Sequence, residues 1–152
     1  ITAVAAGTNI DVTSGTGPVP SVALAIDAEV AFGNQLATKP EMKDYSETVN
    51  AIGATGGGTQ DIDLTLGNVV TATVDSSANT FTFSNPSATG KSCSFTLILT
   101  NGGSQTVNWP ASVDFAAATP PALTAVGVDV LAFMTVDAGT RWYGFAGGLG
   151  MA

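Results

Sequence analysis

Apolar and polar positions alternate in short runs from about residue 59 to the end of the chain, and this period of two predicts β-strands. The apolar members of these runs are Ile62, Leu64 and Leu66; Val70, Ala72 and Val74; Phe81 and Phe83; and Phe95, Leu97 and Leu99. Turn-forming residues separate the runs at intervals of about eight to twelve residues, which is typical of sandwiches and barrels. We therefore expect residues 59–152 to form a mainly β, antiparallel β-sandwich or jelly-roll-like head, with about eight strands in two sheets.

Two turns in this region have the residues of β-hairpins. The run Asn101-Gly102-Gly103-Ser104 is expected to turn the chain back onto residues 105–109. The run Asp137-Ala138-Gly139-Thr140 is expected to pair residues 128–136 with residues 141–145. The first of these strands is apolar on both faces, since Leu131 and Phe133 alternate with Val130, Ala132 and Met134. Such a strand lies in the centre of a sheet or has a neighbouring subunit on its outer side.

Residues 1–26 read as a β shaft segment. Apolar residues alternate at Ile10 and Val12 and again at Val22, Leu24 and Ile26, with glycine and proline between the two runs. Two or three strands of this length have no core of their own, so we expect them to intertwine with partner chains.

Residues 27–58 carry nearly all of the helical signal and read as a helical neck followed by a joint. Thr38 and Glu41 have the spacing of a capping box, and Pro40 fits the first turn of a helix. The apolar positions that follow, at spacings of three, four and three, are Met42, Tyr45, Val49 and Ile52. Gly53 then ends the predicted helix, and Gly56-Gly57-Gly58 forms a flexible joint or tight turn.

The apolar seam of this neck has two interpretations. It predicts a short neck in which helices of several copies pack together, with Met42, Tyr45, Val49 and Ile52 as the oligomer contacts. The alternative is an amphipathic helix that packs on its own domain.

Composition narrows the classes of function. The chain has 152 residues, 4 Lys and Arg, 12 Asp and Glu, no His and a formal net charge of -8. This charge should repel nucleic acid and anionic lipid, so we expect neither as a partner. The absence of histidine excludes Ser-His-Asp and Cys-His catalysis and histidine metal sites, and a single cysteine permits no internal disulfide.

High hydropathy accompanies the low charge. Mean hydropathy is +0.33, yet no stretch of about 20 continuous apolar residues is present, so we expect no membrane insertion. The first residues lack the features of a signal peptide and do not begin with Met, so we expect a fragment or a processed product. A homo-oligomer, in which copies of the chain hide apolar surface from water, best explains this combination.

Candidate chemistry is sparse. The loop that ends in Gly90-Lys91-Ser92 resembles a phosphate-binding loop, but a predicted strand follows it where that site needs a helix, so we expect no nucleotide site. Asp61 and Asp63 project from one strand face, where they either bind a hard cation or remain solvated. Nothing marks a glycosidase carboxylate pair, and Cys93 is expected to be a small buried residue. We therefore expect no catalytic residues, no metal and no cofactor.

One aromatic group is a candidate ligand surface. Arg141 is expected either to pair with Asp137 across its own turn or to form an exposed patch with Trp142 and Tyr143 that suits sugar rings. Trp109, which precedes Pro110, is a further candidate for that surface. Trp142 and Tyr143 are adjacent in a strand, so they point to opposite faces.

Residues 79–145 resemble a C-terminal domain that recurs in bacteriophage tail fibres and related virion proteins. The blocks that carry the resemblance are Phe81-Thr82-Phe83-Ser84-Asn85-Pro86, residues 94–100, Trp109-Pro110-Ala111-Ser112-Val113 and Gly139-Thr140-Arg141-Trp142-Tyr143-Gly144. Residues 6–10 and 20–24 are similar to the glycine-punctuated strands of trimeric phage fibre shafts. The resemblance implies a homotrimer, other tail proteins as partners and attachment to a host surface, and it carries no binding or catalytic residues with it.

The function that we expect is that of a non-enzymatic virion structural protein. It would be the distal part of a trimeric tail fibre, located in the virion, that binds a bacterial surface glycan or protein. The alternatives are a capsid or tail decoration protein, a carbohydrate-degrading tailspike fragment and a bacterial trimeric adhesin.

Overall fold

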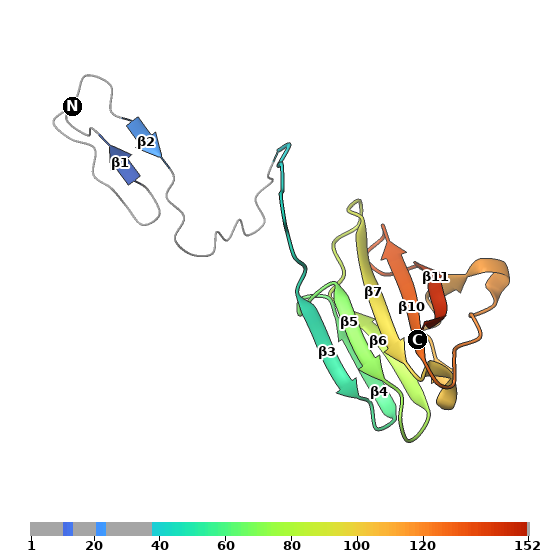
Figure 1. Ribbon diagram of the computed structural model, residues 1–152. Helices are drawn as coiled ribbons and strands as arrows, with labels where there is room; N and C mark the ends of the chain where they lie inside the picture. Colours follow the sequence, from blue (N-terminus) through green and yellow to red (C-terminus); the bar gives the residue numbers. More distant parts are fainter. Residues whose placement is uncertain (1–10, 14–20, 24–37, 152) are drawn as a thin grey trace. The chain divides into compact units, whose positions relative to one another are not determined.

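The chain divides into two units, residues 1–44 and residues 45–152. The computed structural model describes residues 11–13, 21–23 and 38–151 (Figure 1). The predicted neck boundary differs from this division, because residues from Tyr45 onward belong to the second unit.

The described residues of the first unit include a two-stranded sheet. Strand β1 (Asp11–Thr13) pairs antiparallel with strand β2 (Ser21–Ala23). Both lie within the region that was predicted to form short strands. The remaining residues of the predicted shaft lie outside the described residues, and its intertwining with other chains stays a prediction.

The second unit is mainly β and contains two sheets (Figure 1). A six-stranded sheet has the order β3-β5-β7-β10-β11-β9, and a three-stranded sheet has the order β4-β6-β8. The strands are β3 (Val49–Ala54), β4 (Gly58–Asp63), β5 (Val69–Thr73), β6 (Asn79–Ser84), β7 (Cys93–Thr100), β8 (Val107–Asn108), β9 (Val113–Phe115), β10 (Val128–Thr135) and β11 (Trp142–Met151).

From β3 to β8 the chain changes sheet after every strand. Odd-numbered strands β3, β5 and β7 therefore become parallel neighbours in one sheet, and β4, β6 and β8 become parallel neighbours in the other. This connectivity forms three successive coils, each with one strand in either sheet. The expected all-antiparallel arrangement is wrong for these strands, because parallel and antiparallel half-buried strands share the same alternation of residues.

The predicted hairpin at Asn101 is also wrong, because the strand that follows β7 lies in the other sheet. A short 3-10 helix, η1 (Gly102–Ser104), instead carries the chain from β7 across to β8 in the other sheet. Gly103 fits this crossing because a Cβ at that position would overlap the carbonyl oxygen of Leu123.

The last strands complete the large sheet with antiparallel pairs. Strand β10 lies between β7 and β11 and is antiparallel to both, which confirms its central position and the hairpin at residues 137–140. Strand β9 pairs parallel with β11 at the sheet edge.

The predicted neck helix is wrong. Residues 38–53 are all described and contain no helix, and Lys39 and Asp44 have φ angles of 51° and 58°, which no α-helix tolerates. Val49 begins strand β3, whose pairing with β5 supplies backbone hydrogen bonds that local helical preference does not outweigh. Gly53 marks a register shift in this strand instead of a helix end.

The four predicted seam residues do not form one surface. Met42 and Tyr45 are each 69% exposed, whereas Ile52 packs against the core of the second unit. Val49 lies on β3 and is 53% exposed. The oligomer contacts assigned to these residues as a helical seam are therefore not supported by the geometry of the chain.

One hydrophobic core joins the two sheets. Its buried members are Ile62, Leu64, Val70, Ala72, Val74, Phe81, Phe95, Leu97, Leu99, Leu131, Phe133 and Trp142. Phe83 of β6 makes edge contacts with three rings of the larger sheet, and Phe95 stacks on Phe133 with 4.9 Å between ring centroids. The alternation in the sequence predicts most of this core correctly, although Leu66 is 56% exposed.

A buried carboxylate ties the ends of the last hairpin together. Asp129 is fully buried and accepts hydrogen bonds from Thr124 N and Oγ1, both at 2.7 Å, and from Gly150 N at 3.0 Å. Burial acts to raise the pKa of Asp129, but these hydrogen bonds outweigh it and hold the pKa below its ordinary value.

Truncation of the core aromatic Phe133 tests this packing. Phe133→Ala should lower the free energy of unfolding by about 3–5 kcal/mol, because the cavity adds to the lost burial. Urea unfolding followed by circular dichroism measures the change. Leu66→Ala, which shortens an exposed apolar residue, should cost under about 1 kcal/mol, and equal losses in the two variants would contradict the assigned core.

Asp129→Asn tests the buried carboxylate. At pH 7 the variant should lose about 1–3 kcal/mol, because the amide cannot satisfy all three donors. The folded-state pKa lies below the unfolded one, so the wild-type advantage exists above the unfolded pKa and disappears as pH falls through the folded pKa. The gap between the two proteins in urea unfolding should therefore narrow between pH 7 and about pH 3.

Glu47→Gln is the control for this comparison, because it neutralises an exposed carboxylate. It should be close to wild type at both pH values. A gap for Asp129→Asn that stays constant with pH would refute the ionised, hydrogen-bonded state of Asp129.

Candidate functional site

The structure separates the four residues that were predicted as a ligand surface. Trp142 is 1% exposed and belongs to the core, so its predicted ligand contact is wrong. Tyr143 points to the opposite face of β11, as expected, and is 41% exposed. Trp109 is half-buried, and the side chain of Arg141 is 58% exposed.

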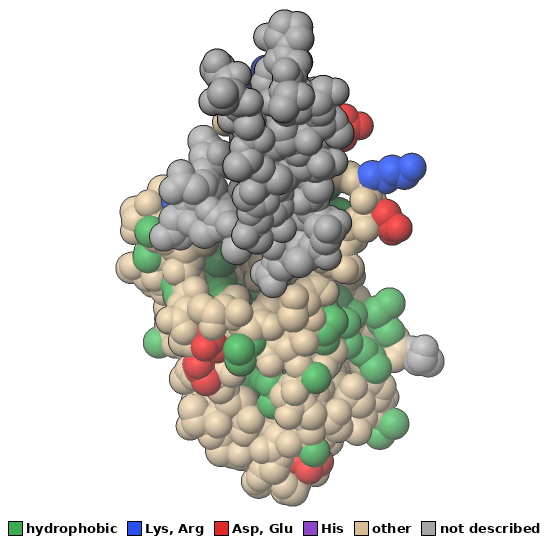
Figure 2. All heavy atoms as spheres, turned by 90° about the vertical axis from the view of Figure 1, so that its left-hand side faces the viewer, with side chains coloured by type: hydrophobic (Ala, Val, Ile, Leu, Met, Phe, Trp, Pro, Cys, Tyr) green, Lys and Arg blue, Asp and Glu red, His purple; other side chains and the backbone are tan. Residues whose placement is uncertain are grey.

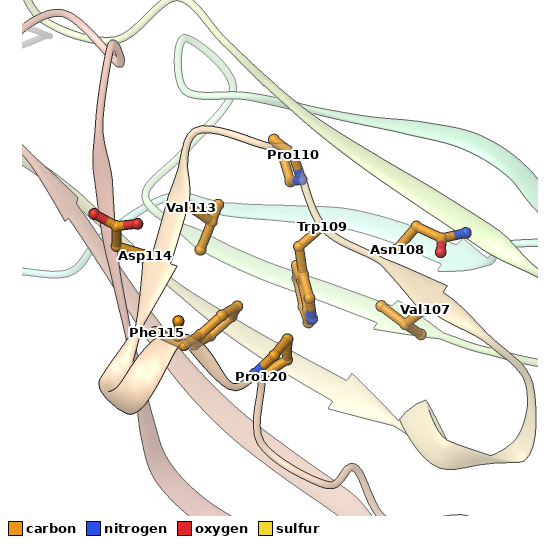
Figure 3. A pocket seen from close by; sticks show the side chains of 9 residues that line it. Val107, Asn108, Trp109, Pro110, Val113, Asp114, Phe115 and Pro120 are labelled. Carbon is orange, nitrogen blue, oxygen red and sulfur yellow. The ribbon is translucent and has the colours of Figure 1, made fainter.

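Trp109 lines an open cavity of about 330 Å³ that is formed by residues 107–120, from β8 to beyond the end of β9 (Figure 3). The other lining residues are Val107, Asn108, Pro110, Val113, Asp114, Phe115, Ala118 and Pro120. Figure 3 shows the indole between Val107 and Phe115, pointing toward Pro120, with Asn108 and Asp114 at opposite edges. We call this space the Trp109 cavity.

Aromatic contacts hold the indole in place. The ring of Trp109 stacks on Phe81 at a centroid distance of 5.5 Å and meets Phe115 edge-on at 5.8 Å. A tilted contact with Phe133 at 5.4 Å connects it to the core. The cavity therefore contains a ring whose orientation the core fixes.

The two polar residues of the cavity are positioned from other strands. The amide Nδ2 of Asn108 donates to the carbonyl of Asn79 at 3.2 Å and to Thr80 Oγ1 at 3.4 Å. The carboxylate of Asp114 lies 3.4 Å from Nε of Arg141 across the β9–β11 pair. Each residue thus supplies a polar edge beside an aromatic centre.

Arg141 has a different ion-pair partner from the one predicted. Its guanidinium pairs with Asp114, while its backbone N–H donates to Asp137 Oδ1 at 3.0 Å. That hydrogen bond, followed by one from the Thr135 hydroxyl, holds the pKa of Asp137 below its ordinary value. Asp137 therefore shapes the turn, and the exposed Arg141–Asp114 pair contributes little stability.

A second cavity, of about 450 Å³, lies on the other side of Asp114 and Phe115. Tyr143, Gly144 and Phe145 of β11 form one wall. Gly144 is required there because a Cβ would lie 2.5 Å from the Phe115 ring. Strand β9 thus separates two cavities of different character.

The aspartate pair on β4 has its lone pairs engaged by neighbouring side chains. Asp61 accepts hydrogen bonds from Thr82 at 2.7 Å and Ser84 at 2.6 Å. Asp63 accepts from the Asn85 amide at 2.9 Å, which is the main reason its pKa lies below the ordinary value. Within the described residues, no group of three or more metal-ligating side chains could hold an ion.

The remaining candidates lie away from both cavities. The loop with Gly90 and Lys91 connects β6 to β7, which confirms that a strand follows it. Cys93 is half-buried at the start of β7 and packs against the core, so it is less buried than predicted.

Asp63, Asp129 and Asp137, which line neither cavity, all have pKa values held below the ordinary value by hydrogen bonds. An aromatic ring with polar groups at its edges suits a ligand that has apolar faces and hydroxyl rims.

Sequence reasoning identified Trp109 but missed Asp114, Phe115 and Pro120. An aromatic residue next to an aspartate, five residues after Trp109-Pro110, was the only local signal for them. Among residues 11–13, 21–23 and 38–151, no helix has the length and apolar character needed to cross a membrane. A scan of protein-family models and searches of curated proteins and of solved structures find no match to this chain.

Proposed function

We propose that this chain is a virion structural protein, the distal part of a trimeric bacteriophage tail fibre, and that it attaches the virion to a bacterial surface glycan. The observation that carries this proposal is the Trp109 cavity, together with the family resemblance of residues 79–145. In this role the protein is non-enzymatic and has the other tail proteins and the host surface as its partners.

The Trp109 cavity fits a single sugar ring. A cavity of about 330 Å³ is at the small end of the range for small-molecule sites. The indole and its aromatic neighbours offer apolar surface to the C–H groups of the ring. Asn108 and Asp114, whose polar groups point away from the indole in Figure 3, offer hydrogen bonds to hydroxyls at the rim of the cavity. The charges beside the cavity favour a neutral or cationic sugar. Asp114 repels anionic groups, and its ion-pair partner Arg141 offsets this repulsion only in part.

Weak individual sites are sufficient for attachment in a trimer. Three cavities on one particle, repeated over several fibres, raise the effective concentration of each site after the first contact. Overall avidity then exceeds the affinity of one cavity by about 10²–10⁴.

A decoration protein is the main competing role, and the second unit would then bind virion proteins instead of host glycans. The experiment below separates these roles. A glycan array made of bacterial surface polysaccharides supplies the probe, and the full chain is the analyte.

Trp109→Ala tests the site. The full chain should bind at least one polysaccharide, and the variant should bind about five-fold more weakly, because an aromatic contact is worth roughly 1 kcal/mol. Asp114→Asn, which keeps the shape of an exposed residue, should also weaken binding. Both variants should keep the wild-type circular dichroism spectrum.

Tyr45→Ala is the matched control, because it removes an exposed aromatic side chain outside the cavity. It should bind like wild type. Binding that is lost equally in Tyr45→Ala, or that is absent from every polysaccharide on the array, would contradict attachment through this cavity.

A further inference from the structure

The six-stranded sheet has an outer face, turned away from the core, that is uncharged at its centre. Its apolar residues are concentrated on β10, and the outward positions of β5 and β7 are mostly threonine and serine. We define this outer sheet face by the outward-pointing residues of β3, β5, β7, β10 and β11. One cross-strand row runs through Val49, Val69, Thr96, Ala132 and Phe145 in register. Residues opposite one another in neighbouring strands project from the same side of a sheet, so this row is continuous across all five strands.

Strand β10 is apolar on both of its sides. Its buried residues, Leu131 and Phe133 among them, alternate with Val128, Val130, Ala132 and Met134, which point outward and are half-buried. At the rim Phe145 is 52% and Tyr143 is 41% exposed. Figure 2 shows hydrophobic side chains gathered at the right of the view.

Charged residues lie around the rim of this face and not at its centre. Residues 45–152 contain seven Asp and Glu and two Lys and Arg, a net charge of -5. None of them is an outward-pointing residue of the five strands, and Asp129 points into the core. Asp114 lies opposite Tyr143 in register at the β9 edge, where it pairs with Arg141. Glu47, which precedes β3, lines a small pocket together with Thr96 and Ala132. Depletion of charge over an apolar centre is the compositional mark of a protein interface core.

We propose that a second copy of this chain covers the outer sheet face. Two copies carry the same net negative charge, so they meet most favourably across surfaces whose centre carries no charge. The centre of the outer sheet face is such a surface. That the protein is an oligomer is part of the proposed function, and this inference rests on the proposed function for that point only. The choice of this face is argued from the residues of the strands.

The size of the face fits this occupant. Five strands spaced about 4.8 Å apart and about 20 Å long cover roughly 500 Å². This is at the upper end of the apolar patches of monomeric proteins and approaches the roughly 800 Å² per partner of a stable interface. In a trimer, three such faces turn toward the threefold axis and form a shared apolar core.

The location of the second cavity agrees with this arrangement. Tyr143 and Phe145 belong both to the outer sheet face and to the cavity of about 450 Å³ beside β9. A neighbouring copy on the face extends over this cavity. The Trp109 cavity lies across β9 and stays open to ligand.

Phe145→Asp and Val49→Asp, made separately in the full chain, test the face. Each places a negative charge at an exposed position of the row, where a monomer tolerates it. Wild type should have the mass of an oligomer by light scattering, and each variant should dissociate at least ten-fold more readily on dilution. Thr80→Asp, which adds the same charge to an exposed position of β6, should dissociate like wild type.

Thiol labelling gives a second readout that contacts made by residues 1–44 cannot mask. In a Cys93→Ala background, Thr96→Cys places a thiol in the row and Thr82→Cys places one on the other sheet, both at half-buried threonines. A maleimide reagent should label Thr96→Cys at least ten-fold more slowly. Adding Phe145→Asp should abolish the difference.

The outcomes separate this inference from the proposed function. A monomeric wild type, equal labelling of the two thiols, or protection that survives Phe145→Asp would overturn the interface. An oligomer that dissociates as described but binds no polysaccharide would leave the interface standing and remove the glycan attachment.

Discussion

The second unit depends on the contact between aromatic rings that come from both of its sheets. Phe83 is supplied by the three-stranded sheet and meets Phe95, Phe133 and Trp142 of the six-stranded sheet, at centroid distances of 4.9 to 5.3 Å. Those three rings come from β7, β10 and β11, so one side chain joins the coiled part of the chain to its antiparallel end. With 11% charged residues, the chain has few ion pairs to replace this packing.

The same packing positions the candidate site. Trp109 directly follows β8, a strand of two residues that has little pairing of its own, and its ring is held by Phe81 and Phe133. Asp114 is placed by the pairing of β9 with β11, next to the turn that Asp137 stabilises. A segment with little regular structure thus presents an ordered ring, because its aromatic side chains belong to the core.

The sequence predicts the strands better than their partners. The alternation in β5 and β7 follows directly from burial of one face, and the structure confirms it. Whether a strand is followed by a neighbour in the same sheet or by one in the other sheet depends on packing between distant residues, which alternation does not contain. The spacing of Thr38 and Glu41 is a local signal for the start of a helix, and it contains no information on tertiary contacts. The pairing of β3 with β5 outweighs this signal.

The candidate site was predictable to a similar extent. A strand places Trp142 and Tyr143 on opposite sides, and the sequence gives no means of deciding which of them is buried. Asp114 and Phe115 enter the site only because β9 pairs with β11, which is a tertiary contact between residues about 30 positions apart in the chain.

Strand β10 contributes to the high mean hydropathy of the chain. A strand at the centre of a sheet needs apolar residues on its inward side alone if water covers the other side, and polar residues then fill the alternate positions. In β10 the outward positions are Val128, Val130, Ala132 and Met134, whereas the outward positions of β5 and β7 are mostly threonine and serine, with Val69 and Ile98 as the apolar exceptions. A mean hydropathy of +0.33, in a chain with no long apolar helix among its described residues, is therefore raised by a central strand that is apolar on both sides. The inward side of β10 belongs to the core that the chain closes by itself, and its outward side is the apolar centre of the surface that we propose a sister copy covers.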